Sequence, residues 1–235
     1  MDVTLSEIIG ESKNIVFFGG AGVSTESGIP DFRSEDGLYS LKYDVPPEEI
    51  LSHTYFMRHT DKFYDFYRDK MIFLSAKPNK AHYKLAQLEN EGRLSAVITQ
   101  NIDGLHTAAG SKCVYELHGS VHRNICQSCG RVFSAEYIMS TTGVPHCECG
   151  GLIKPDVVLY EEPLDEKTVT GAINAISCAD TLIIAGTSLT VYPAAGFVGY
   201  FGGKHLVLIN KSPTPLDGKA DLCIKGKVGD ILGNI

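Results

Sequence analysis

The chain has 235 residues, a formal net charge of −7, 43% hydrophobic residues and 21% charged residues. This is the composition of a globular protein with a buried core, and the acidic balance argues against a protein that binds nucleic-acid phosphates. An acidic surface favours basic partners instead. No basic segment followed by an apolar stretch opens the chain, and no apolar run approaches the roughly 18 residues of a membrane span. We therefore expect a cytoplasmic protein without a membrane partner.

Four short apolar runs predict the strands of one parallel sheet. They cover residues 15–18, 96–98, 182–185 and 206–209, and they lack polar alternation. Such runs are typical of strands that are buried on both faces. Helices are expected between them, one from Asn79 to about Gly92 and another over residues 165–177. The predicted fold is a doubly wound α/β domain.

Two segments depart from this alternation of strands and helices. Residues 39–71 are rich in Tyr, Phe and acidic residues, and we expect amphipathic helices that cover a ligand crevice. Residues 126–149 have polar and turn residues around cysteines and no long apolar run. We expect this region to be an insertion held by something other than a core.

Small or amide side chains follow each of the four predicted strands. Gly19 and Gly20 follow the first, Gln100 and Asn101 the second, Gly186 the third and Asn210 the fourth. In open α/β sheets, ligands bind outside the carboxyl ends of the strands. The sequence therefore predicts one shared crevice suited to a nucleotide.

The glycine-rich turn Gly20-Ala21-Gly22 could hold a pyrophosphate, because backbone N–H groups and a helix start bind anions. It is not a complete dinucleotide fingerprint, because Thr25 stands where the third glycine belongs. An acidic residue that would hold a ribose about 20 residues further on is also absent. A hydride-transfer dehydrogenase is therefore disfavoured, whereas a bound dinucleotide is not.

Longer motifs resolve this ambiguity. The string from Gly20 to Arg33, GAGVSTESGIPDFR, resembles the first signature of the sirtuins, which are NAD⁺-dependent protein deacylases. TQNIDGLH at residues 99–106, ELHG at 116–119 and GTSL at 186–189 resemble later signatures and occur in the family's order. The resemblance implies a Rossmann-like large domain over residues 1–235, with a helical insertion at about 34–75 and a zinc-binding insertion at about 120–155.

The resemblance also implies the activity and the roles of the motif residues. Sirtuins cleave NAD⁺ between nicotinamide and ribose while the amide oxygen of an acyl-lysine attacks the ribose, giving nicotinamide, O-acetyl-ADP-ribose and free lysine. His118 matches the family's catalytic base, a task that suits an imidazole with a pKa near neutrality. Asn101 and Asp103 match its nicotinamide pocket, where the Ile102 backbone also contacts the carboxamide. The remaining expected NAD contacts are Gly20, Ala21, Gly22, Thr25, Phe32, Arg33, Gln100, Gly186, Thr187, Ser188, Asn210, Lys211 and Val228.

The cysteine spacing predicts a four-thiolate metal site. The ligands are expected to be Cys126, Cys129, Cys147 and Cys149, in two pairs with 17 residues between them. The second pair has a one-residue spacer, Glu148, where two residues are usual, so His146 is an alternative fourth ligand and a disulfide is another alternative. Four thiolates leave no open position for water, and the metal is therefore expected to be structural zinc. Cys113, Cys178 and Cys223 are expected to be reduced thiols.

Substrate binding is expected on a peptide-binding strand within residues 154–162, opposite residues 189–192. An acyl-lysine peptide or protein would add there as a strand. The family usually has Phe-Gly-Glu where this chain has Tyr160-Glu161-Glu162, and the extra carboxylate would favour basic substrates. In the helix expected around residue 64, Tyr64 would face the acyl pocket, Tyr67 would replace an arginine that binds acyl carboxylates, and Arg68 would point away. An acetyl group is therefore expected to be preferred over succinyl.

Two other functions are open to such a chain. A mono-ADP-ribosyltransferase would share the cleavage of NAD⁺ but pass the sugar to a protein side chain. A zinc-ribbon binding module without catalysis would give no role to Gln100, Asn101 and Asp103 and would need a basic surface. The complete set of Asn101, Asp103 and His118 favours the deacetylase.

Overall fold

The main sheet lies at the centre of the larger lobe. The structure is a computed structural model that describes residues 4–31, 37 and 44–235. Six parallel strands are arranged in the order β3-β2-β1-β7-β8-β9. The strands are β1 (Ile15–Gly19), β2 (Leu94–Thr99), β3 (Val114–Glu116), β7 (Thr181–Ala185), β8 (His205–Asn210) and β9 (Leu222–Lys225). The four apolar runs are confirmed as β1, β2, β7 and β8, which occupy the middle of the sheet.

The edge strands β3 and β9 were not predicted from the sequence. All three residues of β3 are half-buried, and β9 alternates half-buried with exposed residues. An edge strand is covered less than a central one, so it does not need the continuous apolar run that marks β1 or β7.

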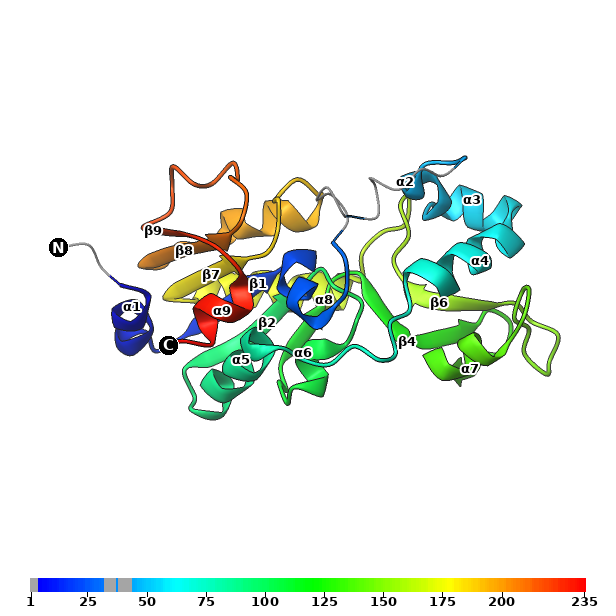
Figure 1. Ribbon diagram of the computed structural model, residues 1–235, viewed down its shortest axis with the longest axis horizontal. Coiled ribbons are helices and arrows are strands. Elements are labelled where there is room, and N and C mark those ends of the chain that lie inside the picture. The colour runs from blue at the N-terminus through cyan, green and yellow to red at the C-terminus, as the bar shows by residue number, and fades with distance from the viewer. Residues whose placement is uncertain (1–3, 32–36, 38–43) are drawn as a thin grey trace.

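Helices cover both faces of the sheet (Figure 1). Ile15 and Phe17 of β1 pack in one core cluster with α1 (Leu5–Glu11), α5 (Lys80–Asn90) and α9 (Val228–Leu232). Val16 and Phe18 point to the other face, toward α8 (Glu166–Cys178) and the 3₁₀ helix η4 (Ala194–Tyr200). The doubly wound α/β fold is thus confirmed.

The predicted helix starts agree with the capping chemistry. The Asn79 side chain accepts a hydrogen bond from the Ala81 backbone N–H at 2.9 Å, which starts α5. The Asp165 carboxylate accepts one from the Thr168 N–H at 2.8 Å, which starts α8. Such side chains satisfy N–H groups that have no partner within the helix.

A smaller lobe lies beside the sheet, on the right in Figure 1. Its helices are α2 (Pro47–Ile50), α3 (His53–Arg58), α4 (Thr60–Lys70) and α7 (Ala135–Ser140). Its antiparallel sheet has the order β5-β4-β6, with β4 (Gly119–Cys126), β5 (Val132–Phe133) and β6 (Ile153–Val157). The helical and cysteine-bearing segments, far apart in sequence, are therefore neighbours in space.

These two segments share one hydrophobic core, which corrects the expectation for residues 126–149. Ile138 of α7 and Cys126 are buried in the same cluster as Phe56, Phe63 and Tyr67. Phe56 and Phe63 pack edge to face with ring centroids 4.9 Å apart. The cysteine region looked coreless in the sequence because its apolar partners come from α3 and α4.

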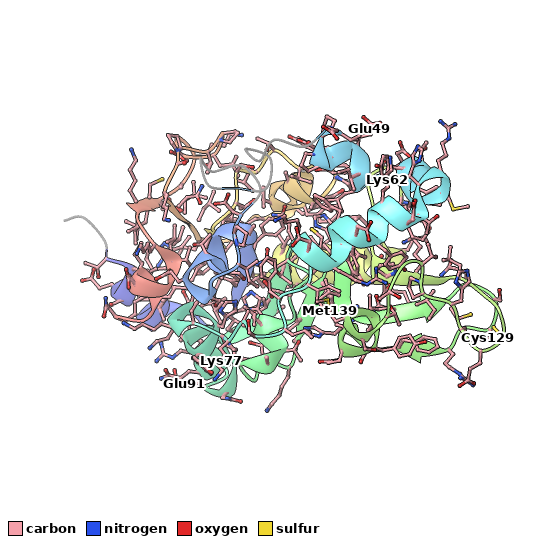
Figure 2. All side chains as sticks on the ribbon, turned by 45° about the vertical axis from the view of Figure 1, so that its right-hand side comes forward. Glu49, Lys62, Lys77, Glu91, Cys129 and Met139 are labelled. Carbon is pink, nitrogen blue, oxygen red and sulfur yellow. The ribbon has the colours of Figure 1, made fainter. Side chains whose placement is uncertain are left out.

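Several segments connect the lobes. The link from α4 to α5, residues 71–79, returns the chain to the large lobe, and the polypeptide crosses again between β3 and β4 (Figure 1). Figure 2 shows Cys129 at the outer end of the small lobe and Glu91 on the large lobe. Within the described part of the chain, no helix has the length and apolar character needed to cross a membrane.

Candidate active site

A cavity of about 860 Å³ lies where the carboxyl ends of the central strands meet the small lobe. Fifteen of the expected NAD contacts line it. They are Gly20, Ala21, Gly22, Thr25, Gln100, Asn101, Ile102, Asp103, His118, Gly186, Thr187, Ser188, Asn210, Lys211 and Val228. The other two, Phe32 and Arg33, lie outside the described residues. The structure therefore brings the described motif residues together, as parallel strands require.

The glycine turn after β1 packs directly against the turn after β7. The Gly22 N–H donates to the Gly186 carbonyl at 2.8 Å, and the Gly20 N–H donates to the Ala185 carbonyl at 3.1 Å. A Cβ on Gly22 would lie 2.7 Å from Gly186 Cα, closer than real Cβ contacts allow. These glycines serve the close approach of two backbones, and their N–H groups are already used within the protein. The 3₁₀ helices η1 (Ala21–Val23) and η2 (Thr25–Ser27) follow the turn.

Amide and hydroxyl groups at three strand ends bond to one another. Gln100 Nε2, after β2, donates to Thr187 Oγ1 at 3.0 Å. Asn210 Nδ2, at the end of β8, donates to the Thr187 carbonyl at 2.9 Å. Thr187, after β7, thus holds its two neighbours in place along the floor of the cavity.

Ser24, which the sequence did not single out, joins the two residues expected to bind nicotinamide. Its Oγ donates to Asp103 Oδ2 at 2.6 Å and accepts from Asn101 Nδ2 at 3.0 Å. Ser24 is only 1% exposed and lies between η1 and η2. Asp103 Oδ1 accepts a further bond from the Leu105 N–H at 2.9 Å, which starts α6 (Leu105–Ala108). A hydroxyl can both donate to the carboxylate and accept from the amide, as this position requires.

His118 has the orientation that a base needs. Its Nδ1 lies 2.9 Å from the Gln100 carbonyl oxygen, so Nδ1 carries the proton and Nε2 keeps its lone pair. Burial lowers the pKa of His118 from its ordinary value of 6.5, and the bond to the Gln100 carbonyl partly opposes this. Gly119, next in the chain, has φ = 75°, and a Cβ there would lie 1.9 Å from the Asp156 carbonyl oxygen. The turn that positions His118 therefore requires glycine.

Two backbone segments form the walls beside His118. Residues 157–162 line one wall, and Val191, Tyr192 and Pro193 line the other. The Val158 N–H donates to the His118 carbonyl at 3.0 Å, which ties the first wall to His118. This is the segment in which a peptide-binding strand is expected.

Both carboxylates of the Tyr160-Glu161-Glu162 sequence are bonded within the protein. Glu161 has φ = 76° and accepts from the Thr54 N–H at 2.9 Å and the Thr54 hydroxyl at 2.7 Å. Glu162 accepts from Lys154 Nζ at 3.0 Å and lies 2.8 Å from His53 Nδ1. Both carboxylates already accept hydrogen bonds within the protein, so the structure does not show that they bind a basic peptide. A preference for basic substrates stays a prediction.

The expected place of Tyr64 is wrong. Tyr64 and Tyr67 are buried in the small-lobe core and do not line the cavity, and the Tyr64 hydroxyl donates to the Ile153 carbonyl. Arg68 points away from the cavity, as expected, and donates to the carbonyls of Ile138 and Gly143. The α4 register relative to the cavity depends on packing, which helical periodicity alone does not determine. Met71, Phe73 and Leu74, just after α4, line the cavity instead.

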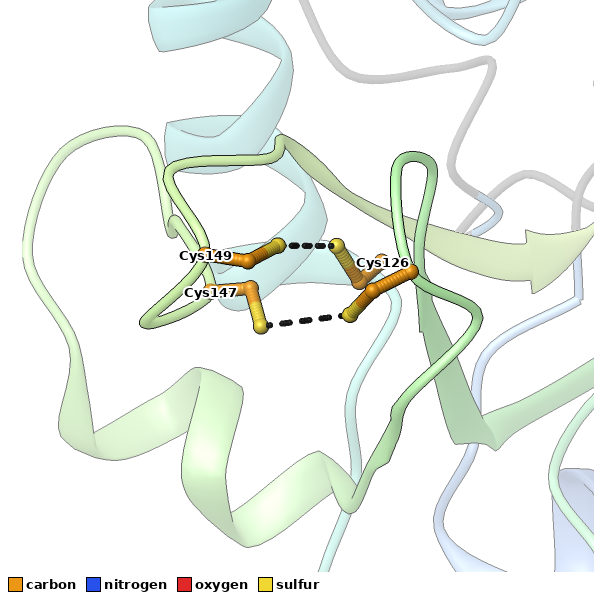
Figure 3. A group of neighbouring side chains, drawn as sticks. Cys126, Cys147 and Cys149 are labelled. Carbon is orange, nitrogen blue, oxygen red and sulfur yellow. Dashed lines mark hydrogen bonds between the residues drawn. The ribbon is translucent and has the colours of Figure 1, made fainter.

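The four cysteines lie together, as a metal site requires (Figure 3). Their Sγ atoms lie within 4.8 Å of one another, with Cys126–Cys149 at 3.5 Å and Cys129–Cys147 at 3.7 Å. A tetrahedron with Zn–S bonds of about 2.3 Å has edges of about 3.8 Å. The one-residue spacer is accommodated by a tight turn, in which the Gly150 N–H donates to the Cys147 carbonyl at 2.8 Å. The four thiolates fit a structural zinc ion.

The first prediction concerns the fourth zinc ligand. His146 Nδ1 lies 2.9 Å from the Val144 carbonyl, and His146 is not part of the cysteine cluster. We expect Cys149→Ser to lose zinc and to lower the melting temperature, because removing a metal from a folded site removes folding free energy. His146→Ala is the matched control and should keep one zinc per chain by elemental analysis. The reverse result would replace Cys149 by His146 in the ligand set.

The second prediction concerns Ser24. Ser24→Ala removes the bond that orients Asp103. Because a hydrogen bond to a charged group contributes about 1.5–3 kcal/mol, we expect kcat/KM for the activity that the motifs imply to fall by about tenfold or more. Thr107→Ala, an exposed change on α6, is the control and should leave kcat/KM unchanged. A Ser24→Ala protein with kcat/KM equal to that control would exclude an orienting role for the hydroxyl.

Comparison with known proteins agrees with this geometry. Residues 20–193 match the sequence profile of the Sir2 family. Proteins of Clostridium acetobutylicum and Clostridium perfringens, both called NAD-dependent protein deacetylase, are 60% and 59% identical, over 98% of this chain and 96% of their own. A Sir2 structure with a deacetylated p53 peptide and 3′-O-acetyl ADP ribose is 38% identical with a TM-score of 0.89, covering 98% of this chain and 96% of that one. The chain belongs to the Sir2 family.

Proposed function

We propose that this protein is an NAD⁺-dependent protein lysine deacetylase. One observation carries the proposal: His118, whose Nε2 keeps its lone pair, lies in the same cavity as Asn101 and Asp103, between two backbone walls that can receive a peptide. The relatives named NAD-dependent protein deacetylase share about three-fifths of its residues along nearly the whole chain. Transfer of ADP-ribose to a protein side chain is not favoured by these relatives.

We assign the nicotinamide end of NAD⁺ to Asn101, Asp103 and the Ile102 backbone. Asn101 is 9% exposed, and Asp103 is fixed through both carboxylate oxygens, so the pocket is preorganised. Rigid donors and acceptors that need no rearrangement favour the reacting geometry. The carboxamide of nicotinamide would still find free lone pairs on the Asp103 oxygens.

We assign the phosphates and riboses to the strand ends. Gly20, Ala21, Gly22 and Thr25 lie on one side of the cavity, and Gly186, Thr187 and Ser188 lie on the facing turn. We assign Gln100 and His118 to the nicotinamide ribose and Asn210, Lys211 and Val228 to the adenosine end; all five line the cavity. Phe32 and Arg33 remain expected NAD contacts through the motif match.

His118 supplies the proton transfer. When the acetyl-lysine oxygen has joined the ribose carbon and nicotinamide has left, a ribose hydroxyl must lose its proton to attack the acetyl carbon. His118 Nε2 can accept that proton because Nδ1 is held protonated by the Gln100 carbonyl. Attack of one water molecule on the acetyl carbon then releases free lysine and leaves O-acetyl-ADP-ribose, and nicotinamide is the third product.

The substrates are proposed to be acetylated lysine side chains of proteins or peptides. Residues 157–160 and 191–193 offer two facing backbone segments to an extended peptide, and such binding depends on main-chain hydrogen bonds. Acetyl is proposed over succinyl because the described residues that line the cavity include no arginine to pair with an acyl carboxylate. Four thiolates kept for a metal need a reducing compartment, which supports a cytoplasmic location.

The third prediction tests the reaction itself. Mass spectrometry of an acetyl-lysine peptide should show loss of the acetyl group only when NAD⁺ is present, together with nicotinamide and O-acetyl-ADP-ribose. His118→Ala should lower the rate by about 10²- to 10⁴-fold, the usual contribution of a general acid–base group, with an unchanged melting temperature. ADP-ribosylated protein without deacetylated peptide would instead identify a transferase.

The fourth prediction concerns pH. The neutral form of His118 is the active one, and its folded pKa is lowered by burial, so the base stays neutral to a lower pH than a free imidazole. The acid limb of kcat/KM should therefore fall below pH 6.5, and kcat/KM should be lost as the pH drops through this lowered pKa. His146→Ala, an exposed histidine away from the cavity, should keep the limb, whereas His118→Ala should abolish it. An acid limb above pH 6.5 would contradict the lowered pKa.

A further inference from the structure

A bulge in β4 reaches from the small lobe to the turn after β2, residues 101–104, which we call the nicotinamide-binding turn. Ser120 pairs with Asp156 and Asn124 pairs with Pro155, so the register passes over residues 121–123 while the partner strand advances by one residue. We call residues 121–123 the β4 bulge. Bulges bend a strand and redirect side chains, and they are frequent next to active sites.

Two successive residues of the bulge donate to two successive carbonyls of the turn. The Val121 backbone N–H donates to the Ile102 carbonyl at 3.0 Å. His122 Nε2 lies 3.0 Å from the Asp103 carbonyl oxygen, so this ring nitrogen carries a proton and donates. The Ile102–Asp103 backbone is therefore held from the small lobe, while the Asp103 carboxylate is held by Ser24 from the large lobe.

The His122 ring lies directly on Gly104. Gly104 has φ = 69°, and a Cβ there would lie 2.8 Å from His122 Cδ2. The absence of a side chain at Gly104 thus has two uses, since it permits the left-handed turn and leaves room for the imidazole. Ring and turn fit together, independently of the hydrogen bond.

Arg123 anchors the other end of the bulge. Its Nη1 lies 2.7 Å from Glu116 Oε2, and its Nε lies 2.7 Å from Asp156 Oδ2. Glu116 ends β3 in the large-lobe sheet, whereas Asp156 belongs to β6 in the small lobe. The bulge is fixed to both lobes, so the position of His122 is defined.

We propose that His122 is a positioning residue for the nicotinamide-binding turn. This rests on the proposed function, because the motif assigns the Asp103 carboxylate to nicotinamide. His122 lines the same cavity and acts through the carbonyl of Asp103 and the backbone of Gly104. Without the His122 donor, the Asp103 carbonyl loses this bond, and the turn that carries the Asp103 carboxylate is held less tightly.

The size of the effect follows from the exposure of the bond. His122 is exposed, and a single hydrogen bond to a backbone carbonyl at an exposed position contributes modestly to the free energy of binding. We expect His122→Ala to weaken nicotinamide binding by about threefold to tenfold. Binding of ADP-ribose should change by less than twofold, because ADP-ribose lacks the nicotinamide that Asp103 holds.

The experiment measures nicotinamide binding without catalysis. The dissociation constant of nicotinamide is determined by ligand-detected NMR on the intact protein saturated with ADP-ribose, and that of ADP-ribose by calorimetry. His122→Gln keeps an amide nitrogen near the position of Nε2 and should bind nicotinamide like the wild type. His122→Asn keeps the polarity but is too short, and it should behave like His122→Ala.

Each other outcome overturns the proposal. Equal nicotinamide affinity in wild type and His122→Ala would show that the contact positions nothing. Equal losses for nicotinamide and ADP-ribose, or a lowered melting temperature with no rescue by His122→Gln, would indicate a general structural role. Failure of the proposed function is separate, because it would appear as a wild type that does not deacetylate an acetyl-lysine peptide with NAD⁺.

Discussion

Parallel pairing of β1, β2, β7 and β8 is the constraint on which the site depends. It sends four carboxyl ends to one edge of the sheet, and each end carries a polar or glycine turn. Gly22 and Gly186 then let two of these turns touch, which closes the floor of the cavity. Larger residues at either position would separate β1 from β7 at the point where their ends must meet.

The small lobe completes what the sheet cannot supply. The sheet provides Asn101 and Asp103 on the turn after β2. The β4 bulge brings donors to the backbone of that turn, and residues 157–160 add a second wall. The turn after β2 is thus fixed by contacts from both lobes, although its residues belong to the large lobe.

The sequence was sufficient for features that are local or contiguous. Central strands appear as apolar runs, helix starts depend on a capping residue such as Asn79, and the motif residues are short strings. It was insufficient where a role arises from distant contacts. Ser24 gains its role from a bond to Asp103, 79 residues away in the chain, and the orientation of Tyr64 depends on how α4 packs. The cysteine region gave a misleading signal because its core is supplied by α3 and α4.

The shared core of the small lobe has a consequence for its unfolding. Ile138 beside the cysteines and Phe63 on α4 are buried in the same cluster, so neither segment has a core of its own. Elements that depend on a common core open together as one cooperative unit, with a free energy below that of global unfolding. Loss of the metal would then expose amides of α4 to hydrogen exchange along with those of the cysteine loops, while β1 and β7 in the other lobe remain protected.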